Sequence, residues 1–87
     1  MDSILSIRSS IKNKARDRRK SLNFSQIELS ERSGVSLGSV KRFESTGEIS
    51  LTSLLKIAIA LECEDDFNKL FLRKNYQSLQ EIINEAN

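Results

Sequence analysis

Apolar residues recur at helical spacing along most of this chain. Between residues 6 and 22 they fall at steps of four, four and seven, which draws one apolar stripe along a helix. These residues are Ile7, Ile11, Ala15 and Leu22. Proline is absent and there are only three glycines, so little interrupts helix formation. The pattern predicts an all-α fold of five helices, followed by a short C-terminal helix.

The second expected helix, residues 25–33, has the clearest start signal in the chain. Ser25 and Glu28 have the spacing of a capping box, in which each side chain accepts the backbone N–H of the other residue. Gly34 then stands where the end of a helix favours a left-handed residue. These signals predict a short helix followed by a sharp turn.

Three more helices are expected after that turn. The third covers residues 37–45, the fourth runs from a cap at Ser50 to about residue 61, and the fifth covers residues 65–72. The third helix is expected to bury Val40 and Phe43, which lie three apart. The buried faces of the fourth and fifth helices are expected to comprise Leu51, Leu54, Leu55, Ala58 and Leu61, and Phe67, Leu70 and Phe71.

Residues 75–87 form a tail that we separate from a domain covering residues 1–74. Ser78 and Glu81 fit a second capping box. Apolar residues then recur at i, i+3, i+4 and i+7. They are Leu79, Ile82, Ile83 and Ala86. This stripe either completes the core or forms a seam for dimerisation or for binding a partner.

The net charge of +2 hides an asymmetry between the two halves of the chain. Residues 1–42 hold ten Lys/Arg and four Asp/Glu, which gives +6, whereas residues 43–87 hold four and eight, which gives −4. A basic half favours a polyanionic partner, although a solvated charged surface would show the same imbalance. The basic segment 6–22 is also typical of membrane-surface or calmodulin-binding helices, but its apolar stripe is narrow and lacks Trp and Phe.

The composition argues against several classes of chemistry. The chain has no histidine and a single cysteine, Cys63, so an internal disulfide, a Cys–His or Ser–His nucleophile pair and most metal sites are unavailable. No apolar run approaches the roughly 18–20 residues of a membrane span, and no signal-peptide core is expected at the N-terminus. We therefore expect a cytoplasmic protein that is not an enzyme, needs no cofactor and uses Cys63 as a small buried residue.

Residues 33–36, Ser-Gly-Val-Ser, join two short helices in a helix-turn-helix pattern. Leu29, Val35 and Val40 would meet inside the corner, and Ser30 is small enough to let the helices cross closely. A helix corner that never meets nucleic acid has the same spacing. The motif alone therefore leaves both interpretations open.

A longer run, FSQIELSERSGVS from Phe24 to Ser36, resembles the phage-repressor family of helix-turn-helix proteins. This is the Cro- and cI-like group, also called the XRE family. The matching positions beyond the run are Val40, Phe43 and Glu44. Residues 49–58, ISLTSLLKIA, resemble the family's fourth helix, and the similarity covers about residues 4–72. The resemblance implies a compact five-helix repressor-like DNA-binding domain, normally paired on a palindromic operator.

In this family the second helix of the motif enters the major groove, and its N-terminal residues reach base edges. Carried over to this chain, that helix is residues 37–45. The candidate DNA-binding residues in and beside it are Ser36, Leu37, Gly38, Ser39, Lys41, Arg42 and Thr46. The resemblance adds Gln26, which would hold a phosphate and brace the motif helix.

The motif helix departs from the best-known readers at its start. Those proteins often carry glutamines where Leu37 and Gly38 stand, and a glutamine can form two hydrogen bonds to adenine. Leu37 offers only apolar contact, and Gly38 offers no side chain at all. Base reading then falls on Arg42, Lys41 and Ser39. The sequence leaves open which of the two basic residues reads a base and which holds a phosphate.

Two arginines of the first helix, Arg16 and Arg19, are further candidates for phosphate contacts. In the family, a glutamate at the position of Glu44 often pairs with a basic residue of the first helix. Arg16 and Arg19 are candidates for this pair too, and the two roles compete for the same side chain.

The resemblance implies a sequence-specific transcriptional regulator that binds double-stranded DNA, acts as a homodimeric repressor and reads the major groove with residues 37–45. The alternative is the DNA-binding antitoxin of a toxin–antitoxin pair, which would also bind and neutralise a toxin protein. The sequence does not separate the two.

Overall fold

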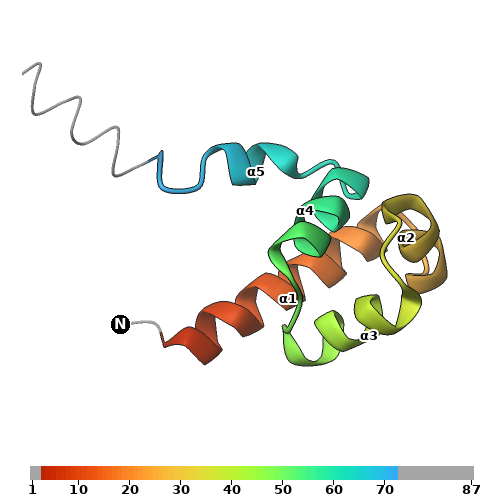
Figure 1. Cartoon of the computed structure of the whole chain (residues 1–87), viewed down its shortest axis with the longest axis horizontal. Coiled ribbons are helices and arrows are strands. Elements are labelled where there is room, and N and C mark those ends of the chain that lie inside the picture. Colours follow the sequence, from red (N-terminus) through yellow and green to blue (C-terminus); the bar gives the residue numbers. More distant parts are fainter. Residues whose placement is uncertain (1–2, 73–87) are drawn as a thin grey trace, which may run out of the picture.

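The computed structural model describes residues 3–72, and within that range it contains α-helices and no strand. The helices are α1 (Ile4–Ser21), α2 (Gln26–Ser33), α3 (Leu37–Thr46), α4 (Leu51–Ala60) and α5 (Glu64–Asn68). The expected all-α, five-helix fold is therefore confirmed (Figure 1). The expected C-terminal helix lies outside the described residues.

Serines define the starts of the first four helices. In each case the serine hydroxyl accepts the backbone N–H of the residue three positions later. These serines are Ser3, Ser25, Ser36 and Ser50. At α2 the full capping box is present, because Glu28 also accepts the N–H of Ser25 at 3.2 Å. Since an N-cap typically contributes about 1 kcal/mol, local sequence fixes where these helices begin.

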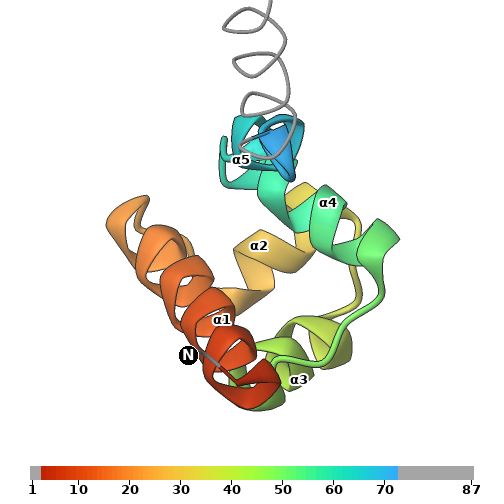
Figure 2. The same ribbon diagram turned by 90° about the vertical axis from the view of Figure 1, so that its left-hand side faces the viewer.

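The packing places α3 at one end of the fold and α5 at the other. The long helix α1 packs against α3, α2 packs against both α3 and α4, and α4 packs against α5. Figure 2, seen from the side, shows α3 at the bottom and α5 at the top of the domain. The buried residues where these helices meet are Leu29, Val35, Val40, Phe43, Ile57 and Leu61. Within residues 3–72, no helix has the length and apolar character to cross a membrane.

Two expected apolar faces are only partly buried. Ala15 and Leu22 of α1 pack against the core, whereas Ile7 and Ile11 remain largely exposed. In α4 the expected burial of Leu51 and Leu55 is wrong, because both are exposed. The buried side of α4 is formed by Leu54, Ile57, Ala58 and, at its end, Leu61. Apolar residues surround most of this helix, so the period alone fits more than one face.

The fifth helix ends sooner than expected. It stops at Asn68, and Leu70 and Phe71 are exposed rather than buried. Phe71 has a φ of 65°, in the left-handed region, so the helical row does not continue past Phe67. Phe67 itself remains half-buried. Apolar residues at helical spacing had suggested a longer helix, but no side chain caps the start of α5, and Phe71, three residues beyond its end, departs from helical geometry.

Candidate nucleic-acid interface

The corner between α2 and α3 has the geometry of a helix-turn-helix. Gly34 adopts φ 75°, and its N–H donates to the carbonyl of Ser30 at 2.9 Å. The Ser30 hydroxyl in turn donates to the carbonyl of Val35 at 2.6 Å, so this small side chain ties the end of α2 to the turn. Val35 is buried in the corner with Leu29 and Val40. The expected turn and its three apolar contacts are confirmed.

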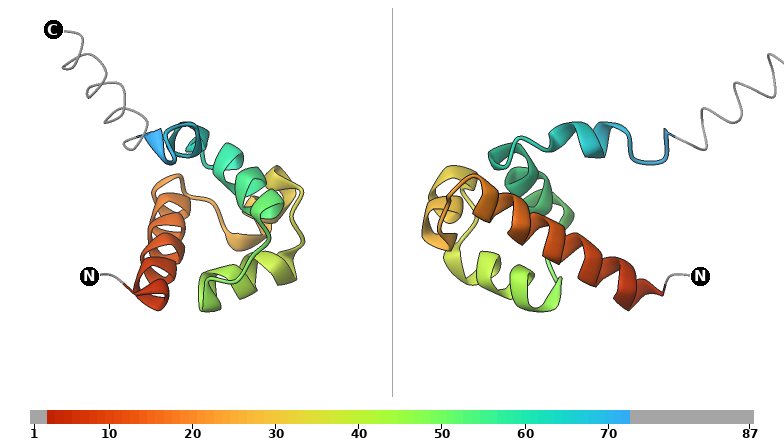
Figure 3. Two further views of the ribbon diagram at one scale, coloured as in Figure 1. Left: turned by 60° about the vertical axis from the view of Figure 1, so that its left-hand side comes forward. Right: turned by 180° about the vertical axis from the view of Figure 1, so that it is seen from behind.

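Helix α3 has two distinct faces. Its inner face is formed by Val40, Phe43 and Glu44, all buried, and Leu37 is half-buried beside them. The outer face comprises Gly38, Ser39, Lys41, Arg42 and Ser45, all exposed. From two further sides, Figure 3 shows α3 at the lower edge of the domain, below α4 and α5. The acidic run 62–66, in and before α5, therefore lies at the opposite end of the domain from α3.

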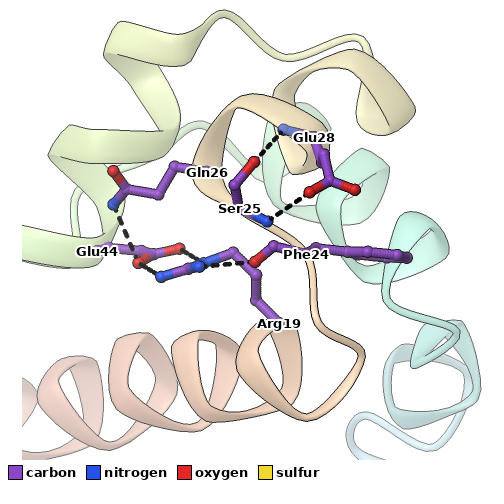
Figure 4. A network of polar contacts seen from close by, with 6 residues as sticks. All are labelled: Arg19, Phe24, Ser25, Gln26, Glu28 and Glu44. Carbon is purple, nitrogen blue, oxygen red and sulfur yellow. Dashed lines mark hydrogen bonds and ion pairs between the residues drawn. The ribbon is translucent and has the colours of Figure 1, made fainter.

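A buried polar network fixes the inner face of α3 (Figure 4). Arg19 of α1 forms two parallel hydrogen bonds with the Glu44 carboxylate, from Nε to Oε2 at 2.7 Å and from Nη2 to Oε1 at 2.9 Å. Its Nη1 donates to the carbonyl of Phe24 at 2.8 Å. Gln26 of α2 adds a bond from Nε2 to Glu44 Oε1 at 3.2 Å. One carboxylate of α3 is thus bound from both α1 and α2.

This network settles several expectations about single residues. The family-type pair of Glu44 with a basic residue of α1 is present, and Arg19 is the partner. Gln26 braces α3 through the same carboxylate, as the resemblance implied. Arg19 and Glu44 are both buried, so this guanidinium belongs to the fold. We assign Arg19 a structural role rather than the phosphate contact that the sequence also allowed.

Arg16 lies in a different environment from Arg19. It is half-buried, and its Nη2 makes one long hydrogen bond, 3.4 Å, to Asn13 on the same helix. Its Nε is buried and has no hydrogen-bond partner within residues 3–72. Because the outer guanidinium donors are not used by an acidic side chain within that range, Arg16 remains a candidate phosphate contact.

The outer face of α3 carries a second arginine–glutamate pair. Arg42 contacts Glu48 through Nη2 and Oε2, and the two side chains are 69% and 47% exposed. Thr46 stands between them, since its hydroxyl donates to the Arg42 carbonyl at 2.7 Å and accepts the Glu48 N–H at 3.0 Å. Thr46 thus shapes the turn, and sequence reasoning missed Glu48. Glu48 lies six residues after Arg42, across the Gly47 turn, and no sequence pattern indicates that the two side chains meet.

Helix α1 also holds the C-terminal end of α3 in place. Lys12 Nζ donates to the carbonyl of Ser45 at 3.2 Å, where a positive charge complements the helix dipole. Gly47 ends α3 with φ 80°, and a Cβ there would overlap the Arg8 side chain. Lys12 therefore binds the end of α3, and the Arg8 side chain fills the space beside Gly47.

The fold and its exposed basic helix define a DNA-binding helix-turn-helix domain, and comparison with protein families leads to the same class. Residues 16–68, more than half of the chain, match the family described as Helix-turn-helix. The chain belongs to this family, in its XRE branch, and is a DNA-binding protein of the transcription-regulator class. The curated proteins and the solved structures gave no match to the chain.

Proposed function

We propose that the protein is a homodimeric repressor that binds a palindromic operator and inserts α3 into the major groove. The observation that supports this most is the division of α3 into two faces. Val40, Phe43 and Glu44 fix the helix to the domain, while Lys41 and Arg42 project from the other side. A helix that is fixed to the domain and has a basic outer face suits base reading, because hydrogen bonds to base edges require donors in a fixed geometry.

The start of α3 offers hydroxyl groups and backbone rather than amide side chains. Ser36 and Ser39 are exposed, and the Ser36 hydroxyl donates to that of Ser39 at 2.9 Å. Both can contact phosphate or bases on the DNA. Leu37 is half-buried, which limits its contact with a thymine methyl to the part of the side chain that remains exposed.

Gly38 lies on the outer face with no atom within 4 Å of the position that a Cβ would occupy, apart from neighbouring backbone. Its φ is not in the left-handed region, so neither packing nor backbone strain requires glycine here. In a helix a glycine costs up to about 1 kcal/mol relative to alanine. A glycine here would let the α3 backbone approach the DNA closely, and we therefore include Gly38 in the proposed interface.

A binding experiment tests the proposed function. A library of random duplexes is selected with the full chain, and the enriched sequence is measured by gel shift over a range of salt concentrations. We expect an enriched sequence with two-fold symmetry and an affinity that falls steeply with salt, since each phosphate contact releases counterions. No enrichment, or equal affinity for a scrambled duplex, would refute sequence-specific binding. A complex with the mass of one chain per operator would refute the dimer.

The alternative function, a DNA-binding antitoxin, needs a surface for a second protein, and the fold offers one candidate. An apolar hollow of about 290 Å³ lies between α1, α4 and α5, with Ile11, Leu54 and Leu70 in its wall. An apolar hollow of this kind is a natural place for a protein partner. Co-expression with the products of neighbouring genes, followed by purification, separates the two functions. A stable complex with a growth-inhibiting protein would favour the antitoxin.

A further inference from the structure

The outer face of α3 holds two basic side chains in different ways. Arg42 is paired with Glu48, whereas Lys41 has no hydrogen bond or ion pair of its side chain within residues 3–72. The residues are adjacent in sequence and both are exposed. Of the two candidate DNA contacts, Arg42 therefore has a carboxylate that can orient it, whereas Lys41 has none within residues 3–72.

The turn after α3 determines where the restraining carboxylate lies. Gly47 takes φ 80°, and the Thr46 hydroxyl links the Arg42 carbonyl to the Glu48 N–H. The Thr46 side chain thereby connects the backbone of Arg42 to the backbone of Glu48. The pair borders a hollow of about 350 Å³ between α3 and the start of α4, whose other walls include Ser39 and Ser50. Arg42 is thus held beside Ser39, on the face that carries the other candidate contacts.

Holding a side chain in one orientation favours a contact with a base but brings little to a contact with a phosphate. A phosphate oxygen accepts a hydrogen bond from many directions, so a flexible ammonium serves it well. Guanine O6 and N7 instead require two donors in one plane, and ordering a long side chain costs free energy at binding. A carboxylate that contacts a guanidinium through one nitrogen orders it in advance and leaves other N–H groups for the base.

From this contrast we infer that Glu48 is a specificity-determining residue that acts through Arg42. It positions the Arg42 guanidinium for a guanine edge, and Lys41 supplies a phosphate contact. The inference rests on the proposed function and assigns the two roles that the sequence left open. Glu48 is a positioning residue, because its effect depends on the arginine.

The inference makes a prediction for each position of the selected DNA. Random-duplex selections are carried out with the wild type and with the variants Glu48→Gln, Arg42→Ala and Lys41→Ala, and with the double variant R42A/E48Q. We expect Arg42→Ala to abolish the preference for guanine at one base pair per half-site. Glu48→Gln should weaken that same preference by up to about five-fold, the size expected for an exposed ion pair. Lys41→Ala should weaken binding to all sequences by the same factor.

Affinity alone would mislead, because removing a negative charge near the DNA also removes a repulsion and so favours binding to every sequence. The measured quantity is therefore the ratio of affinities for the selected duplex and for the duplex with that guanine replaced. Glu31→Gln, at an exposed position of α2, is the matched control and should leave the ratio unchanged. In the R42A background, Glu48→Gln should leave the ratio unchanged as well.

Each other outcome overturns the inference. If Glu48→Gln leaves the affinity ratio unchanged, Glu48 does not contribute to specificity. If the ratio rises, the Glu48 carboxylate competes with the DNA for Arg42. A ratio that falls equally in the R42A background shows an effect that bypasses the arginine. If the wild type shows no sequence preference, the proposed function fails together with this inference. If the wild type selects an operator and the ratio does not fall, only this inference fails.

Discussion

The two arginine–glutamate pairs of α3 combine the same groups in opposite surroundings. Arg19 and Glu44 are buried and joined by two parallel hydrogen bonds. Arg42 and Glu48 meet through one nitrogen and one oxygen, and both side chains remain exposed to solvent. Opening the first pair would leave a charge inside the protein, whereas water replaces the partner in the second. The inner pair therefore fixes the helix, and the outer pair stays accessible to a ligand.

The largest expected effect comes from breaking the inner pair. Glu44→Ala should lower the free energy of unfolding by about 3–5 kcal/mol, because the Arg19 guanidinium stays buried without its carboxylate. Urea denaturation followed by circular dichroism measures the change. Glu48→Ala, the matched change in the outer pair, should stay within about 0.5 kcal/mol of the wild type. Equal losses in the two variants would contradict the comparison.

A double variant separates charge from packing at the inner pair. Replacing Arg19 by methionine and Glu44 by leucine removes both charges and keeps much of the volume. We expect the double variant to be more stable than Glu44→Ala alone, since apolar replacement of a whole buried pair is often neutral. Denaturation under the same conditions gives the answer. A double variant as unstable as the single one would mean that the loss arises from packing or from the Phe24 carbonyl and Gln26 amide left without partners, and not from an unpaired charge.

The outer pair should show the reverse pattern, with little effect on stability and a large effect on recognition. Arg42→Ala should leave the free energy of unfolding within about 0.5 kcal/mol, because the side chain is exposed. It should cost about 1–3 kcal/mol of discrimination at one base pair if it contacts guanine. Gel shifts with the selected and the singly altered duplex measure this cost. A uniform loss on all sequences would instead identify Arg42 as a phosphate contact.

The sequence predicted the features that local chemistry determines. The capping box at Ser25 and the left-handed Gly34 depend on neighbours within a few residues, and the burial of Val40 and Phe43 agrees with their helical spacing. The resemblance added the Glu44 pair but left Arg16 and Arg19 as alternatives. They lie on one helix three residues apart, so only the rotation of α1 against α3 decides which one reaches the carboxylate.

Features that depend on tertiary packing were harder to predict. The apolar residues of α4 fit more than one buried face, and the core selects the one that contains Ile57. Helix α5 ends at Asn68, and no glycine signals the left-handed conformation of Phe71 beyond it. The Arg42–Glu48 contact depends on how the Gly47 turn folds back on α3, and a spacing of six residues does not indicate it.

A smaller effect is expected at the edge of the inner network. Gln26→Ala removes one donor to Glu44, whose carboxylate keeps both hydrogen bonds from Arg19. We expect a loss of about 1 kcal/mol in the free energy of unfolding, measured by urea denaturation. Gln26 is also a proposed phosphate contact, so the variant should weaken DNA binding on all sequences alike, while the salt dependence stays the same because an amide carries no charge. A stability loss with unchanged DNA affinity would restrict Gln26 to bracing α3.

The smallest effect should appear at Gly38, where stability and recognition should change in opposite directions. Gly38→Ala adds a methyl group in open space on a helix, so the domain should become more stable by up to about 1 kcal/mol. The same methyl would occupy the space where we propose that the backbone approaches the DNA, so affinity for the selected duplex should fall.

The variant Gly38→Gln adds a longer side chain at the same position. This side chain must either form hydrogen bonds with a base or prevent the backbone from approaching the DNA. If both variants bound with unchanged affinity and base preference, Gly38 would be only a tolerated surface residue. The outer face would then consist of its side chains alone, while the inner pair would hold α3 as before.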